Sequence, residues 1–173
     1  MIDGYIQSGL DATKPAPGLP QNIEAEQDLL GALLSDNEIF DKIPDNLDES
    51  HFFNPLNGRI FAATRKLYSN GQLANPVTLK SYFIGDATFA EIDIESYLRE
   101  LIENVTSLSD AKFYAEDIYQ CYLRRRLILI SDETISRSRT ANMDHSAESL
   151  IEETEQQLFE LAENDKVSSG LTP

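Results

Sequence analysis

The chain has 173 residues, 41% of them hydrophobic, and a formal net charge of −16. This is the composition of a globular protein that is long enough to bury a core, and its acidic surface would repel the phosphate backbone of nucleic acids. The chain lacks an apolar run of membrane-spanning length, a signal peptide at its start and any cysteine besides Cys121, so we expect a soluble cytoplasmic protein without an internal disulfide or a cysteine-rich zinc site.

Residues 1–19 contain glycines and prolines without apolar periodicity, which predicts a flexible N-terminal tail. A helix is predicted to follow Asn22, whose side chain can accept from the free amides of the first turn, with Glu24 and Glu26 at the positive end of the helix dipole. Gly31 weakens this helix by propensity but leaves room for another helix to pack closely. The residues expected on its buried face are Ile23, Leu29, Leu30, Leu33 and Leu34.

Capping and stop signals predict the next two helices. Ser35-Asp36-Asn37-Glu38 has the pattern of a capping box for a short helix that ends before Pro44. Asn54-Pro55 and Asn70-Gly71 have the patterns of the start and stop of a helix of about four turns. The basic side chains of that helix are expected to face solvent: Arg59, Arg65 and Lys66.

Two more helices are predicted before residue 107. Thr78 is expected to cap a short helix that runs up to Gly85, and Thr88–Glu91 offers another capping box. Apolar residues over 94–105 then recur on one helical face. Together these segments predict a compact helical head over residues 20–106.

The longest helical pattern opens at Ser107 or Ser109. The polar stretch 137–146 is the expected place for the chain to turn, and Asp144 or Ser146 can cap a last helix.

The last helix carries a narrow apolar seam between acidic faces. Its seam and flanking residues are Ala147, Leu150, Ile151, Thr154, Leu158, Leu161 and Ala162. Such a seam suits helix pairing better than burial in a globular core. We therefore predict a long helix and a helical hairpin for self-association over 107–163, and a linker or chain end over 164–173. The residues expected to mediate self-association are Leu150, Ile151, Thr154, Leu158 and Leu161.

No motif for catalysis or cofactor binding is evident. None of the eight glycines precedes a lysine, so the chain has no visible P-loop for a nucleotide. His51 and His145 are too far apart in sequence to form a local ligand pair, and neighbouring acids such as Glu24 and Glu26 are expected to be solvated. We therefore expect no catalytic residue, cofactor or metal in this chain.

Arginines are concentrated in one stretch of the second half. Five of the fourteen basic residues lie within sixteen positions, at Arg124, Arg125, Arg126, Arg137 and Arg139. We favour a cationic helix face that pairs with the chain's own carboxylates; the alternative is contact with a partner, a neighbouring subunit or nucleic acid, for which the candidates are Arg124, Arg125, Arg126 and Arg137. The chain lacks the aromatic pattern of RNA-reading sheets and a recognition-helix pattern, so sequence-specific nucleic-acid binding is not expected.

Several short stretches of the sequence, taken in their order along the chain, point to a known family. They are Glu24-Ala25-Glu26-Gln27 with Leu30-Gly31-Ala32-Leu33-Leu34, His51-Phe52-Phe53-Asn54-Pro55 with Arg59-Ile60-Phe61, Pro76-Val77-Thr78-Leu79, Tyr97-Leu98-Arg99-Glu100-Leu101, Tyr114-Ala115 with Ile118, Arg126-Leu127-Ile128, and Glu155-Gln156-Gln157-Leu158-Phe159-Glu160-Leu161-Ala162. Over about residues 20–163 they resemble the N-terminal domain of replicative DnaB-type DNA helicases. Asn57-Gly58 departs from this resemblance, since the family usually has a histidine there, and Asp93–Ser96 lacks the usual Gly-Gly pair.

The resemblance implies an all-α fold, in which a compact helical bundle head is followed by a two-helix hairpin. It also implies that hairpins of neighbouring subunits pair into a collar above a hexameric motor ring. In the family this collar receives a DnaG-type primase and, in some bacteria, the helicase loader.

Family members continue into a RecA-like ATPase domain, whose motifs this sequence lacks. ATP, Mg and DNA are therefore expected partners of the missing motor of a full-length 5′–3′ helicase at the bacterial replication fork, and this chain resembles an excised N-terminal domain that does not unwind DNA. The alternatives are a stand-alone all-helical adaptor associated with nucleic acid and a small helical enzyme.

Overall fold

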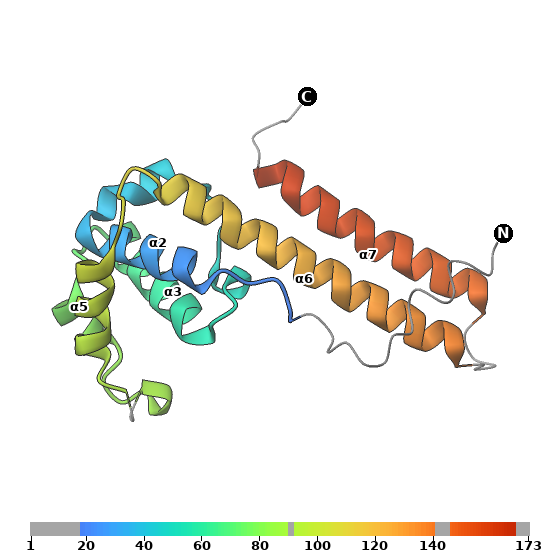
Figure 1. The fold of residues 1–173 in the computed structure, drawn as a ribbon, viewed down its shortest axis with the longest axis horizontal. Coiled ribbons are helices and arrows are strands. Elements are labelled where there is room, and N and C mark those ends of the chain that lie inside the picture. The colour runs from blue at the N-terminus through green and yellow to red at the C-terminus, as the bar shows by residue number, and fades with distance from the viewer. Residues whose placement is uncertain (1–17, 90–91, 141–145, 169–173) are drawn as a thin grey trace.

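The computed structural model describes residues 18–89, 92–140 and 146–168, without the side chains of Thr88 and of 164–168. The predictions for 1–17, for Ala90 and Glu91, for Asp144 and for 169–173 lie outside these residues. The described part is helical and contains no strand, which confirms the all-α prediction. Figure 1 shows a cluster of short helices at one end of the molecule, with a long helix leaving it and a second helix lying alongside.

The helices follow one another in an order close to the predicted one. They are α2 (Ile23–Ser35), η1 (Asn37–Lys42), η2 (Glu49–His51), α3 (Pro55–Ser69), α4 (Pro76–Tyr82), η3 (Ala87–Phe89), α5 (Ile94–Asn104), α6 (Ala111–Arg139) and α7 (Ala147–Ser168), where η marks a 3₁₀ helix.

Helix α2 lies at the centre of the head, in contact with α3, α5 and α6. It begins where Asn22 predicts, since the Asn22 side-chain oxygen accepts from the amide of Ala25 at 3.0 Å. The Asn22 side-chain nitrogen donates to Asp117 on α6 at 2.6 Å, so one side chain caps α2 and ties it to α6. Of the expected face, Leu29, Leu30 and Leu33 are 0% exposed and Leu34 is also buried, whereas Ile23 is half-buried.

At Gly31 the backbone of α5 lies directly against α2. A Cβ atom added there would collide with the carbonyl oxygen of Leu101 and lie 3.1 Å from the Cβ of Val105. The prediction that Gly31 leaves room for another helix is confirmed, because here the partner is a backbone carbonyl and only a residue without a side chain fits.

Glu26 is buried, although its sequence position indicated a solvated acid in the first turn. Its side chain is 2% exposed. Its carboxylate accepts from the amides of Phe53 at 2.5 Å and Asn54 at 3.3 Å, and from the Asn57 side chain at 2.9 Å. Asn57 in turn accepts from the Tyr97 hydroxyl at 2.7 Å. One acid therefore joins α2 to the start of α3 and to α5.

Burial raises the pKa of Glu26, and the donors around it offset that effect only in part. Because the folded pKa lies above the unfolded one, the stability that this group contributes is lost as the pH rises through the folded pKa. The ionised carboxylate fixes the arrangement of α2 and the start of α3 through these donors.

Asn57 and Gly58, which depart from the family resemblance, belong to this same region. Both are buried. A Cβ atom on Gly58 would collide with the carbonyl of Glu49, so η2 packs directly on the backbone of α3. The Asn57 amide thus donates to Glu26, and Gly58 beside it leaves room for η2.

Several helix starts differ from the predicted ones. Ser35 does not cap the second helix: it is the last residue of α2, its hydroxyl donates to Gly31, and Asp36 in an extended conformation caps η1, which is a 3₁₀ helix. Thr78 is not a cap either. Pro76 occupies the first position of α4, so Asn75 is the cap and Thr78 completes its capping box.

Helix α6 also starts later than predicted. The hydroxyls of Ser107 and Ser109 lie 2.9 Å apart and cap nothing, and Asp110 precedes the first helical residue without a side-chain cap bond. The predicted start and stop of α3 are confirmed, since Asn54 caps it and Gly71 follows it with a φ of 70°, whereas α4 ends at Tyr82 and not at Gly85.

Two of the three basic residues of α3 are not solvated as expected. Arg65 lies over the Phe61 ring at 4.7 Å and donates to the Leu47 carbonyl. Arg59 pairs with Asp86 and lies over the Phe89 ring at 4.8 Å. Their long stems cover apolar surface while the charged heads find polar partners. The third residue, Lys66, is exposed as predicted.

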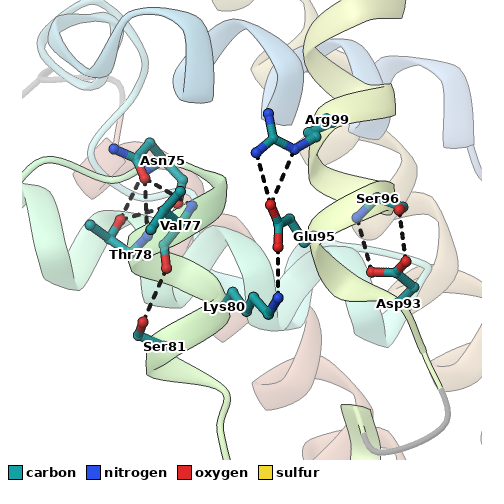
Figure 2. A network of polar contacts seen from close by, with 9 residues as sticks. All are labelled: Asn75, Val77, Thr78, Lys80, Ser81, Asp93, Glu95, Ser96 and Arg99. Carbon is teal, nitrogen blue, oxygen red and sulfur yellow. Dashed lines mark hydrogen bonds and ion pairs between the residues drawn. The ribbon is translucent and has the colours of Figure 1, made fainter.

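Charged side chains join α4 to α5 at the edge of the head (Figure 2). Glu95 accepts from Lys80 at 2.7 Å and from Arg99 at 2.8 Å. These hydrogen bonds, first that of Lys80 and then that of Arg99, lower the pKa of Glu95 to about 2. Asp93 caps α5 by accepting from the amide of Ser96. These contacts set the position of the short helix α4, which has only one buried side chain of its own among its seven residues.

We expect Gly31→Ala to destabilise the fold, although alanine is the better helix former. The added methyl meets the backbone carbonyl of Leu101, which moves only if α5 moves, and overpacking of this kind costs about 1–3 kcal/mol. Urea unfolding followed by circular dichroism measures the change. The matched control is Gly18→Ala, because a Cβ atom there meets nothing. An unfolding midpoint of Gly31→Ala at or above that of the parent would contradict the close packing.

We expect Glu26→Ala to destabilise the head much more than Glu24→Ala. The first change takes the acceptor from the amides of Phe53 and Asn54 and leaves the buried Asn57 side chain without its acceptor, at about 1–3 kcal/mol for each group that water does not reach. The second removes an exposed acid from the same helical turn. The same urea titration compares them, and equal midpoints would rule out the structural role of Glu26.

Candidate self-association surface

Helix α6 has two halves with different surroundings. Its first half belongs to the core of the head, where Ala111, Ala115, Ile118 and Tyr119 are buried. Beyond Tyr119, Ile130 is its only buried residue. In Figure 1 this second half extends away from the head, and α7 runs back along it in the opposite direction. Helices α6 and α7 thus form the predicted hairpin.

Hydroxyls and one arginine make the described polar contacts between α6 and α7. The hydroxyls of Thr134 and Thr154 face each other at 3.3 Å, and each also lies 2.7 Å from the carbonyl four residues before it in its own helix. Arg137 donates to Glu153 on α7 at 2.6 Å and lies 3.6 Å from Glu133 on its own helix. Ser146 begins α7, as predicted, by accepting from the amide of Ser149 at 3.1 Å.

The five predicted self-association residues divide into two groups. Leu150, Thr154 and Leu161 are half-buried, and their spacing of four and seven places them on the side of α7 where Thr154 meets α6. Ile151 and Leu158 lie on the other flank of Thr154, roughly 60° and 40° around the helix, and are 63% and 42% exposed. The apolar surface of α7 is therefore wider than the sequence pattern indicated. Its inner edge contacts α6, and its outer edge is exposed to solvent.

Phe159 belongs to the outer edge, and sequence reasoning missed it. It is 58% exposed and follows Leu158 directly. We name the exposed set Ile151, Leu158 and Phe159 the outer edge of α7. A seam built on spacings of three and four skips residue 159, but an aromatic residue beside two aliphatic ones on an exposed helix was the available signal.

A groove of about 1140 Å³ lies between the two helices and includes the outer edge. The residues that line it are Thr134, Ser136, Arg137, Ser138, Thr140, Ser146, Ala147, Leu150, Ile151, Thr154, Glu155, Leu158 and Phe159. Helix α6 supplies mostly hydroxyls and α7 mostly apolar groups. Four of the five predicted residues, all except Leu161, are thus brought together in one depression.

The arginine cluster is split by the fold. Arg125 is part of the head: it donates to the carbonyls of Pro20 at 2.8 Å and His51 at 2.7 Å. Arg137 pairs with acids of its own chain, as the favoured interpretation of the cluster expects. Arg124 and Arg126 are exposed. These two are the members of the predicted set whose side chains are most available to a partner.

His51 and Cys121 serve packing in the described structure. His51 is 7% exposed, its Nδ1 accepts from the amide of Asp48 at 3.1 Å, and its ring lies 4.3 Å from that of Tyr122. Burial lowers the pKa of His51 and raises that of the half-buried Cys121. In the part of the chain that the structure describes, no three potential ligands gather for a metal ion, and no helix is long and apolar enough to cross a membrane.

Comparison with known proteins gives one consistent family. A family model of the DnaB-like helicase N-terminal domain matches residues 18–120. The replicative DNA helicase DnaB of Rickettsia felis is 34% identical over 161 residues, which is 92% of this chain and 33% of that protein. The DnaB of Rickettsia typhi is 36% identical over 144 residues, 83% of this chain and 29% of that protein. The chain therefore spans about a third of the length of these relatives.

Solved structures share the fold. The N-terminal domain of DnaB helicase from Mycobacterium tuberculosis matches with a TM-score of 0.71 at 23% identity, over 83% of this chain and 99% of that chain. A DnaB-like replicative helicase, whose structure is described with its interactions with primase, matches with a TM-score of 0.63 at 22% identity, over 81% of this chain and 31% of that chain. The family model covers more than half of the chain and the Rickettsia relatives more than four fifths of it, so the chain belongs to the family of DnaB-like helicase N-terminal domains.

Proposed function

We propose that this chain is the assembly and partner-docking domain of a replicative DNA helicase, and that copies associate through the α6–α7 hairpin. The observation that carries the proposal is the outer edge of α7, where Ile151, Leu158 and Phe159 stand in solvent beside the apolar side of the groove. Large apolar side chains grouped in this way are typical of a surface that another protein covers. The division into a head over 20–106 and a self-association hairpin over 107–163 is part of this proposal.

The energies favour a dimer of modest affinity. Ile151 and Leu158 would each contribute roughly 1.5–3 kcal/mol if a partner buried them fully, and Phe159 about as much. The inner residues Leu150 and Leu161 add less, because α6 already covers half of each. Two copies double the gain, but association costs about 4–15 kcal/mol, and acidic residues flank the outer edge.

Charge can offset part of that repulsion. Glu148, Glu152 and Glu155 are exposed on α7, and Arg124 and Arg126 are exposed on α6. A second hairpin that brings its arginines to these acids would relieve like-charge repulsion, at a strength that salt reduces. Arg125 is unsuited to this role because the head already uses it, and Arg137 would have to leave Glu153.

We expect the double substitution Ile151→Ala with Leu158→Ala to make the chain monomeric in analytical ultracentrifugation. Both side chains are largely in solvent within one chain, so the head should stay folded while the dissociation constant rises at least about tenfold. Higher salt should weaken association of the parent only in part, because the apolar contribution remains.

The matched control is Leu73→Ala with Val77→Ala. These residues are 66% and 60% exposed on the head, so a similar apolar area is removed far from the hairpin. If the hairpin variant sediments like the parent at every concentration, the hairpin is not the interface. A control variant that becomes monomeric would place the interface on the head.

Within the whole helicase, this proposal extends to a hexameric ring that receives a primase and, in some bacteria, a loader. Its support is the family, together with a neighbouring fold that is described with primase interactions. ATP and Mg would bind the motor domain of that longer protein, which would act at the replication fork in the cytoplasm. This chain would contribute assembly and docking and no catalysis.

We expect the C-terminal domain of a DnaG-type primase to bind the assembled full-length ring in calorimetry, and to bind this isolated chain more weakly. Several subunits can build one docking site, and linking them raises the effective concentration. The Ile151→Ala, Leu158→Ala variant of the isolated chain serves as the unassembled reference. A ring that gives no binding heat and does not shift the primase in sedimentation would refute the docking role.

A further inference from the structure

Within a single chain, the side chains of helix α7 bury very little surface. None of the side chains described in it, from Ala147 to Glu163, is buried. Helix α2 gives the contrast within the same chain, because eight of its thirteen residues are buried. In proteins, most helix stability comes from tertiary packing of an apolar face, and α7 has only the edge of such a face against α6.

The polar contacts between α6 and α7 are also limited. The Thr134 and Thr154 hydroxyls each have one proton, and each has a carbonyl of its own helix at 2.7 Å. A hydrogen bond between the two therefore takes one proton away from such a carbonyl. The ion pair of Arg137 with Glu153 is exposed, and pairs of this kind contribute little.

Without a partner, the charged side chains of residues 147–163 do not stabilise α7. Residues 147–163 contain six glutamates and neither lysine nor arginine. Glu148 and Glu152 are four residues apart and repel each other along the helix. Glu160 and Glu163 lie in the second half of α7, toward the negative end of its dipole, where acidic groups are unfavourable. The one basic residue in the sequence of α7 is Lys166, in its last turn, so positive charge along 147–163 has to come from outside this helix.

From these observations we infer that the docking of α7 on α6 is coupled to self-association: in a single chain α7 leaves α6 readily, and a second copy fixes it by covering the outer edge. This rests on the proposed function. The second copy is the partner with matching chemistry, because its own outer edge is apolar and its exposed Arg124 and Arg126 complement the acidic α7. If α7 is docked on α6 in only a fraction of the chains, the apparent affinity for a second copy is the intrinsic affinity multiplied by that fraction.

Hydrogen exchange read by mass spectrometry tests the state of α7 in the monomer. In parent protein diluted until sedimentation shows monomers, the amides of 150–161 should exchange at least about 100-fold faster than those of α2, relative to their unstructured rates. At a concentration where dimers dominate, exchange in α7 should slow at least about tenfold while exchange in α2 stays the same. Equal protection of α7 in both states would overturn the coupling.

A disulfide staple between α6 and α7 gives an independent readout. The facing hydroxyls of Thr134 and Thr154 lie close enough for Thr134→Cys with Thr154→Cys, made in a Cys121→Ser background so that one pair alone can form. The oxidised form should self-associate about tenfold more tightly than the reduced form of the same protein, which is the matched control. Equal dissociation constants for the two forms would overturn the coupling.

The outcomes separate this inference from the proposed function. If the parent associates through the hairpin while α7 is as protected in the monomer as in the dimer, the coupling is wrong and the assembly role stands. If the parent remains monomeric at every concentration, or if the outer-edge variant still associates, the assembly role fails and the coupling fails with it. Should the staple not form on oxidation, the exchange experiment decides alone.

Discussion

The buried carboxylate of Glu26 is the interaction on which the arrangement of the head depends. It takes donors from the chain before α3 and from α3 itself, and through Asn57 it reaches Tyr97 on α5. Arg125 on α6 attracts the same charge and at the same time holds the carbonyls of Pro20 and His51. Apolar packing alone would tolerate several rotations of these helices. The Glu26 carboxylate meets all of its donors in only one of these rotations.

Helix periodicity and caps predict most of the fold, because both depend on local chemistry. The starts at Asn22 and Asn54 and the apolar stripes of α2 and α5 follow from short stretches of sequence. The burial of Glu26 and the covered positions of Arg59 and Arg65 do not, since each depends on residues more than fifteen positions away. A pattern that classes charged residues as solvated misses every one that has a distant partner.

The apolar surface of α7 could be predicted from the sequence, but its division into an inner edge on α6 and an outer edge in solvent could not. The sequence of α7 has apolar residues over a wide sector, and spacing alone does not divide that sector between α6 and a second chain. The structure divides it, with Thr154 facing Thr134 and Ile151 in solvent. Phe159 could be noticed as an aromatic residue near two aliphatic ones, but its exposure follows only from the structure. The same holds for the arginines, of which the head takes Arg125 and leaves Arg124 and Arg126 outside.

Helix α6 runs without interruption from Ala111 to Arg139, through the core of the head and out along the hairpin. At about 1.5 Å per residue it is about 43 Å long. Its first part, up to Tyr119, is packed in the head, and the rest extends beyond the head. From Tyr119 to Arg139 the helix extends about 30 Å, so a tilt of about 5° at Tyr119 would move the far end by about 3 Å, roughly half the rise of one helical turn. The hydrogen bonds of Arg125 on α6 to Pro20 and His51, and of Asn22 to Asp117 on α6, therefore determine where a neighbouring subunit finds the hairpin, at a distance that neither residue can reach by contact.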